Sequence, residues 1–359
     1  MPSHFFQIGD EPHKKFTEWA RSLGDIYSVQ LGQQNLIILT SDKIVGELLQ
    51  KRGAKYSTRM NGSGFEILTR GKGYAASPYN ERYRKINPIT SAKTKDGFYP
   101  KYFFQHTALN IISLLCFNKR TDSVDDPFYR EFENLMGTRF ELAKDTISAS
   151  LTWLTAALAN NPHVQSKAHQ ELDRVIGQSR MPEVSDEQNI PYIRAIIKEG
   201  QRYCGAIYLG VPHAIDEDDE YNGYHIPANS VVILNQYGIH MDEKRYENPK
   251  EFKPERFLGF TGSSAALANG NYENRDHFGF GAGRRLCTGI HMAERELLLG
   301  VSRLLWCFKI ENASPLGKDG KPIPINLDKI RNGLTVWPED YKVRFVKMLK
   351  RFYPDRVKS

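Results

Sequence analysis

Cysteine is scarce in this sequence. The 359 residues include 4 cysteines, and no two of them form a C-x-x-C pair: Cys116, Cys204, Cys287 and Cys307. Without paired cysteines, neither a disulfide framework nor a zinc site is predicted. The pattern fits the reducing setting inside a cell.

Long apolar runs are missing as well. The most apolar stretch covers residues 107–117, which is much shorter than the roughly 20 residues that a helix needs to cross a bilayer. The N-terminus lacks the basic segment followed by an apolar segment that marks a signal peptide. We therefore expect no membrane-spanning segment in this chain.

Charge of one sign is not concentrated anywhere. The formal net charge is +7, but no basic run carries interleaved aromatic residues. Nucleic-acid binding is therefore not predicted. A dispersed basic surface is better suited to an acidic protein partner. Hydrophobic residues at 40% and charged residues at 25% are typical of a globular protein.

Hydrophobic periodicity predicts a fold that is mainly α with small β-sheets (α+β). Helices are expected over 13–23, 42–51 (with Asp42 as N-cap), 101–117, 127–150, 162–177, 190–203 and 288–308. Short strands are expected over 26–31, 36–39, 208–214, 224–226 and 231–234, and a closing hairpin over 334–345.

The segment 278–289, Phe-Gly-Phe-Gly-Ala-Gly-Arg-Arg-Leu-Cys-Thr-Gly, carries the densest chemical signal. Its four glycines allow tight turns and a close approach to a flat ligand. Cys287 directly precedes a predicted helix, whose positive end favours a thiolate over a thiol. A rigidly held anionic sulfur is what an axial haem ligand requires.

Other interpretations of this segment stay open on the residues alone. Cys287 could be a small buried hydrophobic residue in a glycine-rich turn. A phosphate-binding loop would need a Lys-Ser or Lys-Thr pair after the glycines and a preceding strand, and neither is present. A thiol nucleophile would need a positioned base, for which His291 is the nearby candidate.

The segment resembles the haem-binding signature of the cytochrome P450 family, F-x-x-G-x-R-x-C-x-G, through Phe280, Gly283, Arg285, Cys287 and Gly289. The resemblance implies haem b (iron protoporphyrin IX) as cofactor, with Cys287 as the axial ligand of the iron. It also implies that Arg285 binds a haem propionate through its planar guanidinium.

Further matches lie elsewhere in the chain. Glu199 and Arg202 match the family's E-x-x-R, and Arg256 lies in a P-E-R-F motif. The resemblance implies a buried network of these three residues, which is stable only when every partner is present. His213 stands where family members often carry a propionate ligand. The alternative for His213 is an ordinary histidine in a turn. The alternative for Glu199 and Arg202 is an ion pair at the surface.

The Asp145-Thr146 pair resembles the acid–alcohol pair of the family's oxygen-activating helix. The resemblance implies that the two side chains relay protons to the reacting oxygen. The match is incomplete, because Leu142 and Ala143 replace the small residue and the glycine of the family motif. An acid and an alcohol on a helix surface is the alternative.

The chain also departs from the family. The family's W-R-x-x-R falls on Tyr83, Arg84 and Asn87, so a second propionate contact is in doubt. An N-terminal anchor is expected to be absent, and the stretch between Tyr83 and Asp145 is short for the helices that cover the substrate pocket. We expect residues 1–359 to form a single haem-thiolate domain that lacks much of this cover.

Two functions are carried forward from the resemblance. The first is a haem-thiolate monooxygenase that hydroxylates or epoxidises an apolar small molecule, in fungal secondary metabolism, with electrons from an NADPH-dependent reductase. The second is a degenerate, non-catalytic haem-binding relic of such an enzyme. The resemblance places the protein inside the cell at the surface of the endoplasmic reticulum, with the cytoplasm as the alternative.

Overall fold

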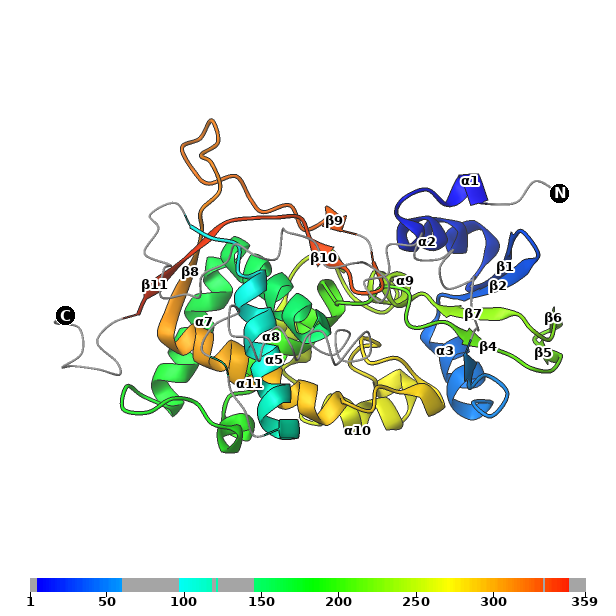
Figure 1. Cartoon of the computed structure of the whole chain (residues 1–359), viewed down its shortest axis with the longest axis horizontal. Helices are drawn as coiled ribbons and strands as arrows, with labels where there is room; N and C mark the ends of the chain where they lie inside the picture. The colour runs from blue at the N-terminus through cyan, green and yellow to red at the C-terminus, as the bar shows by residue number, and fades with distance from the viewer. Residues whose placement is uncertain (1–4, 60–96, 118–120, 122–144, 332, 349–359) are drawn as a thin grey trace. The chain divides into compact units, whose positions relative to one another are not determined.

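The structure is a computed structural model that describes residues 5–59, 97–117, 121, 145–331 and 333–348. The chain divides into two compact units, whose elements are labelled in Figure 1. The unit that we call the sheet unit comprises Met1–Gly73, Gln201–Glu251 and Gly262–Met292. The unit that we call the helical unit comprises Tyr74–Gly200, Phe252–Thr261 and Ala293–Ser359.

A five-stranded sheet organises the sheet unit. Its strand order is β1 (Ile26–Leu31), β2 (Gln34–Leu39), β7 (Val231–Leu234), β4 (His213–Ala214) and β3 (Thr58–Arg59). The first two strands form an antiparallel hairpin, and β2 pairs with β7 in parallel. Gly32 begins the turn with a φ of 60°, a backbone conformation that glycine adopts without strain. A separate hairpin joins β5 (Asp219–Tyr221) to β6 (Tyr224–Ile226).

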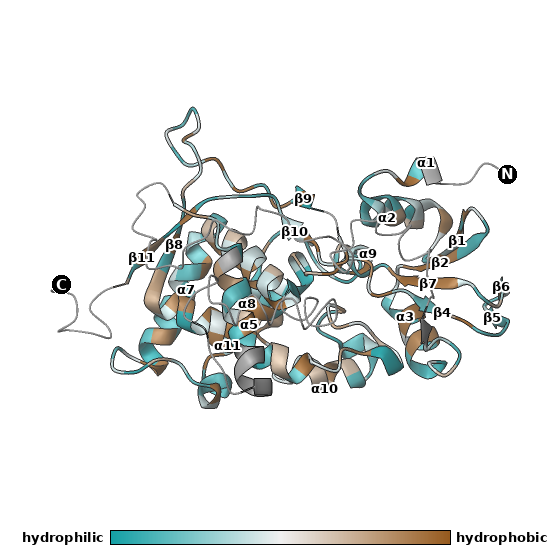
Figure 2. Ribbon diagram, in the orientation of Figure 1, coloured by the Kyte–Doolittle hydropathy of each residue, from teal (hydrophilic) through white to brown (hydrophobic). Residues whose placement is uncertain are grey.

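Both faces of this sheet are covered. Successive side chains point to opposite faces of a strand, so Val231 and Ile233 join one core cluster and Val232 and Leu234 the other. Figure 2 accordingly shows β7 in the hydrophobic colour. One face packs against Phe16 and Trp19 of α2 (Pro12–Leu23).

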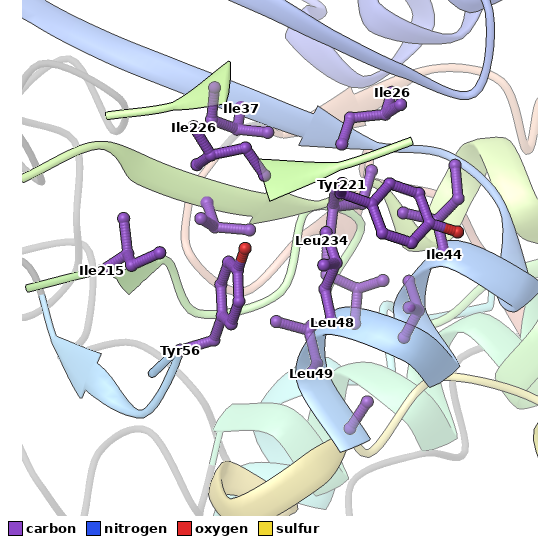
Figure 3. Close-up of a cluster of buried hydrophobic side chains, with 14 of the residues drawn as sticks. Ile26, Ile37, Ile44, Leu48, Leu49, Tyr56, Ile215, Tyr221, Ile226 and Leu234 are labelled. Carbon is purple, nitrogen blue, oxygen red and sulfur yellow. The ribbon is translucent and has the colours of Figure 1, made fainter. Parts of the chain in front are cut away.

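The other cluster, shown in Figure 3, is covered by α3 (Asp42–Val45) and by the π-helix η1 (Gly46–Lys51). Leu48 and Leu49 point into it beside Tyr56. The helix was predicted here, but with the wrong cap. Ser41 has the extended backbone of an N-cap, and Asp42 is the first helical residue.

Helices dominate the helical unit. They are α5 (Lys101–Phe117), a helix over 145–160, α7 (Pro162–Val175), α8 (Pro191–Tyr203) and α11 (Ile290–Cys307), of which the last two also enter the sheet unit. Gly200 allows α8 to approach the helix over 145–160 closely, because a Cβ at this position would lie 2.3 Å from Leu154 Cδ2. In the described part of the chain, no helix is both long and apolar enough to cross a membrane.

The predicted hairpin over 334–345 is wrong. Its two halves instead pair with different partners: β10 (Trp337–Pro338) with β9 (Ile330–Arg331), and β11 (Val343–Lys347) with β8 (Phe308–Asn312). Phe345 packs against Phe308 and Phe98, with ring centroids 5.5 and 5.2 Å apart. Strand partners are chosen by such long-range packing, which a local pattern does not contain. The strand expected over 208–214 is similarly reduced to His213–Ala214.

Glu296 on α11 has a carboxylate oxygen that is buried without a hydrogen-bond partner among the described residues. Burial raises its pKa from 4.5 to about 7. The folded protein thus binds the proton more tightly than the unfolded chain does. The stability contributed by protonated Glu296 is complete below about pH 4.5 and is lost as the pH rises through about 7.

We therefore expect Glu296→Gln to change stability little near pH 4 and to raise the free energy of unfolding by about 2 kcal/mol near pH 8. Urea denaturation at the two pH values measures the difference. Glu294→Gln on the same helix is the control. A stabilisation that does not depend on pH would contradict the assignment.

Candidate functional site

The glycine-rich segment 278–289, which we call the cysteine loop, is closed by its own backbone. The Cys287 N–H donates to the Phe280 carbonyl at 2.9 Å, and the Leu286 N–H donates to the Gly283 carbonyl at 3.0 Å. Cys287 lies three residues before α11, whose Ile290 N–H approaches the Cys287 carbonyl at 3.3 Å. Its side chain is an exposed, free thiol. The loop therefore presents an accessible sulfur from a constrained backbone.

Gly283 is where the cysteine loop meets η1. Its φ is +65°, and a Cβ at this position would lie 1.7 Å from the Leu49 carbonyl oxygen. No side chain fits there, because the two backbones are in contact. Gly281 also has a positive φ, of +77°, but its Cβ would meet no atom closer than 3.8 Å. The requirement for glycine is thus steric at Gly283 and only conformational at Gly281.

Buried side chains at its start hold the loop in the sheet unit. Phe278 and Ala282 are fully buried members of the core cluster that α3 and η1 cover. Phe280 and Leu286 pack against Ile290 and against α10 (Ser264–Asn269). At the end of the loop, a Cβ on Gly289 would lie 3.8 Å from Cys287 Sγ. The apolar part of the loop is therefore turned into the core, while Cys287 remains exposed.

Two residues expected to bind haem propionates converge on one stretch of backbone. Arg285 Nε donates to the Ser57 carbonyl at 2.6 Å. His213 Nδ1 lies 2.8 Å from the adjacent Tyr56 carbonyl. His213 is buried, whereas Arg285 is exposed. The sheet unit thus brings an exposed guanidinium and an exposed sulfur together on one loop, a donor set that fits an iron porphyrin with anionic propionates.

Glu199 and Arg256 form a buried ion pair in the helical unit. Arg256 Nε lies 3.1 Å from Glu199 Oε1, which also accepts the Lys253 N–H at 2.8 Å. Arg256 lies in the 3-10 turn η6 (Pro254–Phe257). Glu199 has no exposed surface. The backbone donor and the guanidinium together offset the desolvation of this carboxylate.

Arg202, one helical turn from Glu199, donates to three backbone carbonyls. Its Nη1 donates to the carbonyls of His240 and Pro249 at 2.8 and 2.9 Å, and its Nη2 to that of Glu251 at 3.3 Å. The first of these carbonyls ends α9 (Gln236–His240), and the other two lie in the irregular segment that follows it in the sheet unit. Arg202 therefore fixes the backbone of residues 240–251, in addition to its expected role in the network with Glu199 and Arg256.

We expect Arg256→Met to lower the free energy of unfolding by about 3 kcal/mol, because it removes a cation that is hydrogen-bonded to the buried Glu199 carboxylate. Lys167→Met removes the cation of the exposed Lys167–Glu255 pair, whose side chains are 53% and 31% exposed. We expect this matched control to change stability by less than about 1 kcal/mol. Equal losses in urea denaturation would contradict the buried-pair argument.

Asp145 and Thr146 begin the described part of the helix over 145–160. Asp145 is 4% exposed, and Thr146 is half-buried. Gln105 of α5 donates from Nε2 to Asp145 Oδ1 at 2.9 Å, so an amide orients the carboxylate. Sequence reasoning missed Gln105, although a polar residue in an apolar helix was a usable signal. Asp145 and Thr146 belong to the helical unit, and Cys287 to the sheet unit.

Several positions of the sequence argument lie outside the described residues. They are the three positions of the W-R-x-x-R comparison and the two that precede the acid–alcohol pair: Tyr83, Arg84, Asn87, Leu142 and Ala143. The interpretations that depend on them stay predictions.

The architecture has a counterpart among solved structures. A zebra fish cytochrome P450 superposes with a TM-score of 0.73, covering 94% of this chain and 99% of that chain at 21% sequence identity. This likeness identifies a P450-type fold and confirms the predicted mainly helical class with small sheets.

Sequence comparison shows the family. The family model described as Cytochrome P450 matches residues 3–97 and 143–333. Cytochrome P450 monooxygenase atE of Aspergillus terreus is 30% identical, with 86% of this chain and 79% of atE covered. The monooxygenase virE of Hypocrea virens is also 30% identical, with 93% and 81% covered. The monooxygenase patI of Aspergillus clavatus is 45% identical over 66% of this chain and 42% of its own length.

The chain therefore belongs to the cytochrome P450 family, as its sequence predicted. The relatives named above are monooxygenases, which are oxidoreductases, so the predicted enzyme class is confirmed. The family implies a haem cofactor, a redox partner and a small-molecule substrate. Residues 98–142 lie between the two matched segments, in the region where the sequence departs from the family.

Proposed function

We propose that this protein is a haem b-dependent monooxygenase that hydroxylates or epoxidises an apolar small molecule of fungal secondary metabolism. An NADPH-dependent reductase supplies its electrons, at the surface of the endoplasmic reticulum. The observation that carries the proposal is the cysteine loop, where an accessible sulfur and an accessible guanidinium extend from one constrained backbone. Fungal monooxygenases among the relatives support the substrate class.

In this proposal, the Cys287 thiolate would hold the haem iron. When bound, iron protoporphyrin IX with a thiolate ligand supplies the activation of dioxygen. Arg285 and His213 would hold the propionates, Gly283 lets the loop pack against the Leu49 carbonyl, and Gly289 places no side chain beside the Cys287 sulfur. Phe280 accepts the Cys287 N–H on its carbonyl and keeps the loop closed at 2.9 Å. Arg202 fixes residues 240–251 of the sheet unit, and the Glu199–Arg256 pair stabilises the helical unit.

Asp145 and Thr146 are the proposed proton donors. Asp145 accepts a hydrogen bond from Gln105 on Oδ1, which orients the carboxylate for proton exchange with water or with the Thr146 hydroxyl. An alcohol next to a carboxylate can pass on a proton while the carboxylate is replenished from solvent. In this proposal, Asp145 and Thr146 control the rate of proton delivery, and the cysteine loop binds the cofactor.

A turnover assay tests the enzymatic role. With NADPH, a reductase and an apolar substrate panel, the protein should couple NADPH oxidation to product formation. Asp145→Asn should keep the haem spectrum and lower the turnover about 100-fold, because the amide cannot deliver the proton. Asp173→Asn, an exposed change on α7, should leave turnover unaltered.

The second candidate is a haem-binding relic without turnover. The shortened stretch before Asp145 favours it, because a site open to water loses oxidising equivalents to side reactions. The same assay separates the two functions. A protein that shows thiolate-bound haem but consumes NADPH only to release peroxide, with every substrate tested, would be the relic. We propose residues 1–359 as a single haem domain in either case.

A further inference from the structure

Two buried histidines contact the backbone that leads into the cysteine loop. The Phe278 N–H donates to His240 Nε2 at 2.8 Å, and the Gly279 N–H donates to His277 Nδ1 at 3.1 Å. His240, which ends α9 (Gln236–His240), is 4% exposed, and His277 is 1% exposed. A ring nitrogen accepts a hydrogen bond only when it carries no proton. Both rings are therefore neutral, each with a defined tautomer.

His277 is oriented by its second nitrogen. With Nδ1 accepting, Nε2 carries the proton and faces the Ser264 hydroxyl at 3.3 Å. Ser264 donates in turn to Asp276 Oδ2 at 2.5 Å. Asp276 Oδ1 accepts the His277 backbone N–H at 2.8 Å. The ring is thus held in one orientation by a chain of hydrogen bonds that begins on α10.

The backbone of His240 is anchored by Arg202. The His240 carbonyl accepts Arg202 Nη1 at 2.8 Å and the His240 ring accepts the Phe278 N–H, so His240 links Arg202 to the cysteine loop. Burial lowers the pKa of His240 well below 6.5, and the nearby guanidinium groups of Arg202, Arg245 and Arg275 lower it further. The ring stays an acceptor over the working pH range.

Phe278 and Gly279, whose N–H groups the two histidine rings accept, are the first two residues of the cysteine loop. The next carbonyl, that of Phe280, accepts the Cys287 N–H at 2.9 Å. Arg275 donates to the His277 carbonyl at 2.9 Å and to the Gly281 carbonyl, and its guanidinium lies 4.3 Å from the Phe278 ring centroid. The backbone of 277–281 is therefore held by side chains, whereas the segment that carries the sulfur is exposed.

We propose that His240 and His277 are positioning residues for Cys287, which hold the backbone at Phe278 and Gly279 and thereby fix where the sulfur meets the haem iron. This inference rests on the proposed function, in which Cys287 is the iron ligand. It also implies that Arg202 supports the cysteine loop indirectly, by holding the backbone of His240. Neither histidine contacts the cofactor in this role; each acts through the backbone.

Paired substitutions on the full-length protein test the inference. His240→Leu and His277→Leu remove the acceptors, whereas His240→Gln and His277→Asn place an amide oxygen near the position of Nε2 or Nδ1. His13→Leu is the matched control, because His13 is equally buried in the same unit and its Nε2 has no hydrogen-bond partner among the described residues.

Two quantities are measured. One is the rate at which the ferrous carbon monoxide complex changes from the thiolate band to that of haem without thiolate, in mild urea. The other is hydrogen exchange at the Phe278 and Gly279 amides. Leaving a buried N–H unpaired should accelerate both about tenfold in the leucine variants. The amide variants and His13→Leu should stay within about twofold of the wild type.

Leucine variants that match the wild type in both measurements would overturn the inference. So would amide variants, or His13→Leu, that change as fast as the leucine variants, since the loss would then be general. A wild type without the thiolate band would overturn the proposed function instead. The exchange rates at Phe278 and Gly279 would then alone decide whether the histidines hold the loop.

Discussion

Cys287→Ala should abolish the red-shifted Soret band of the ferrous carbon monoxide complex. Alanine removes the sulfur that we propose as the axial ligand, and none of the other cysteines lies in the cysteine loop. The thiolate is also the source of the electron density that favours O–O cleavage, so substrate oxidation should be lost with it. Absorption spectra of the purified, reduced and carbon monoxide-treated variant measure the first effect directly.

Cys307→Ala is the control for this experiment. Cys307 ends α11, the helix that begins after Cys287, and its side chain is partly exposed. This variant should keep the thiolate band. If Cys287→Ala kept the band, or if folded wild-type protein bound no haem, the proposed ligand would be wrong.

Gly283→Ala should be the most damaging conservative change in the cysteine loop. A Cβ 1.7 Å from the Leu49 carbonyl oxygen requires η1 and the loop to separate, and the φ of +65° adds left-handed strain. Together these effects should lower the free energy of unfolding by about 3–5 kcal/mol. Urea denaturation measures the loss, and haem content should fall with it because the loop moves away from its support.

Gly281→Ala separates the two causes. It has a similar φ of +77°, but the nearest atom to its Cβ is 3.8 Å away. Only the conformational strain remains, so we expect a loss of about 1 kcal/mol. If the two alanine variants were equally destabilised, the contact with Leu49 would not be the cause.

Local patterns predicted most of the described helices well, but the helix expected over 127–150 continues to residue 160, and its part before residue 145 lies outside the described residues. Pro162 in the first turn and Gly177 after the last, with a φ of 71°, bound α7 as expected. The pairing of β1 with β2 was also readable, because a short polar turn separates two apolar runs. These elements are specified by residues that are neighbours in the chain, so their pattern is complete within a short window.

The same reasoning failed where partners lie far apart. The 334–345 segment looked like a hairpin, but β11 pairs with β8, which precedes it by about 30 residues. The Gln105–Asp145 hydrogen bond joins two helices across the part of the chain that departs from the family. The residue spacing within one helix does not reveal which residue of another helix it will contact.

For the proposed site, the sequence by itself determined which residues to consider. Cys287, Arg285 and the glycines are contiguous, so the resemblance of their spacing to the family signature, on which the proposed haem-thiolate site rests, was readable before any fold was known. Only the tertiary structure decided what holds that loop: the Leu49 carbonyl against Gly283, the Ser57 carbonyl on Arg285, and His240 on Phe278. These contacts join distant segments through backbone atoms, which every residue possesses, so no side-chain pattern could reveal them.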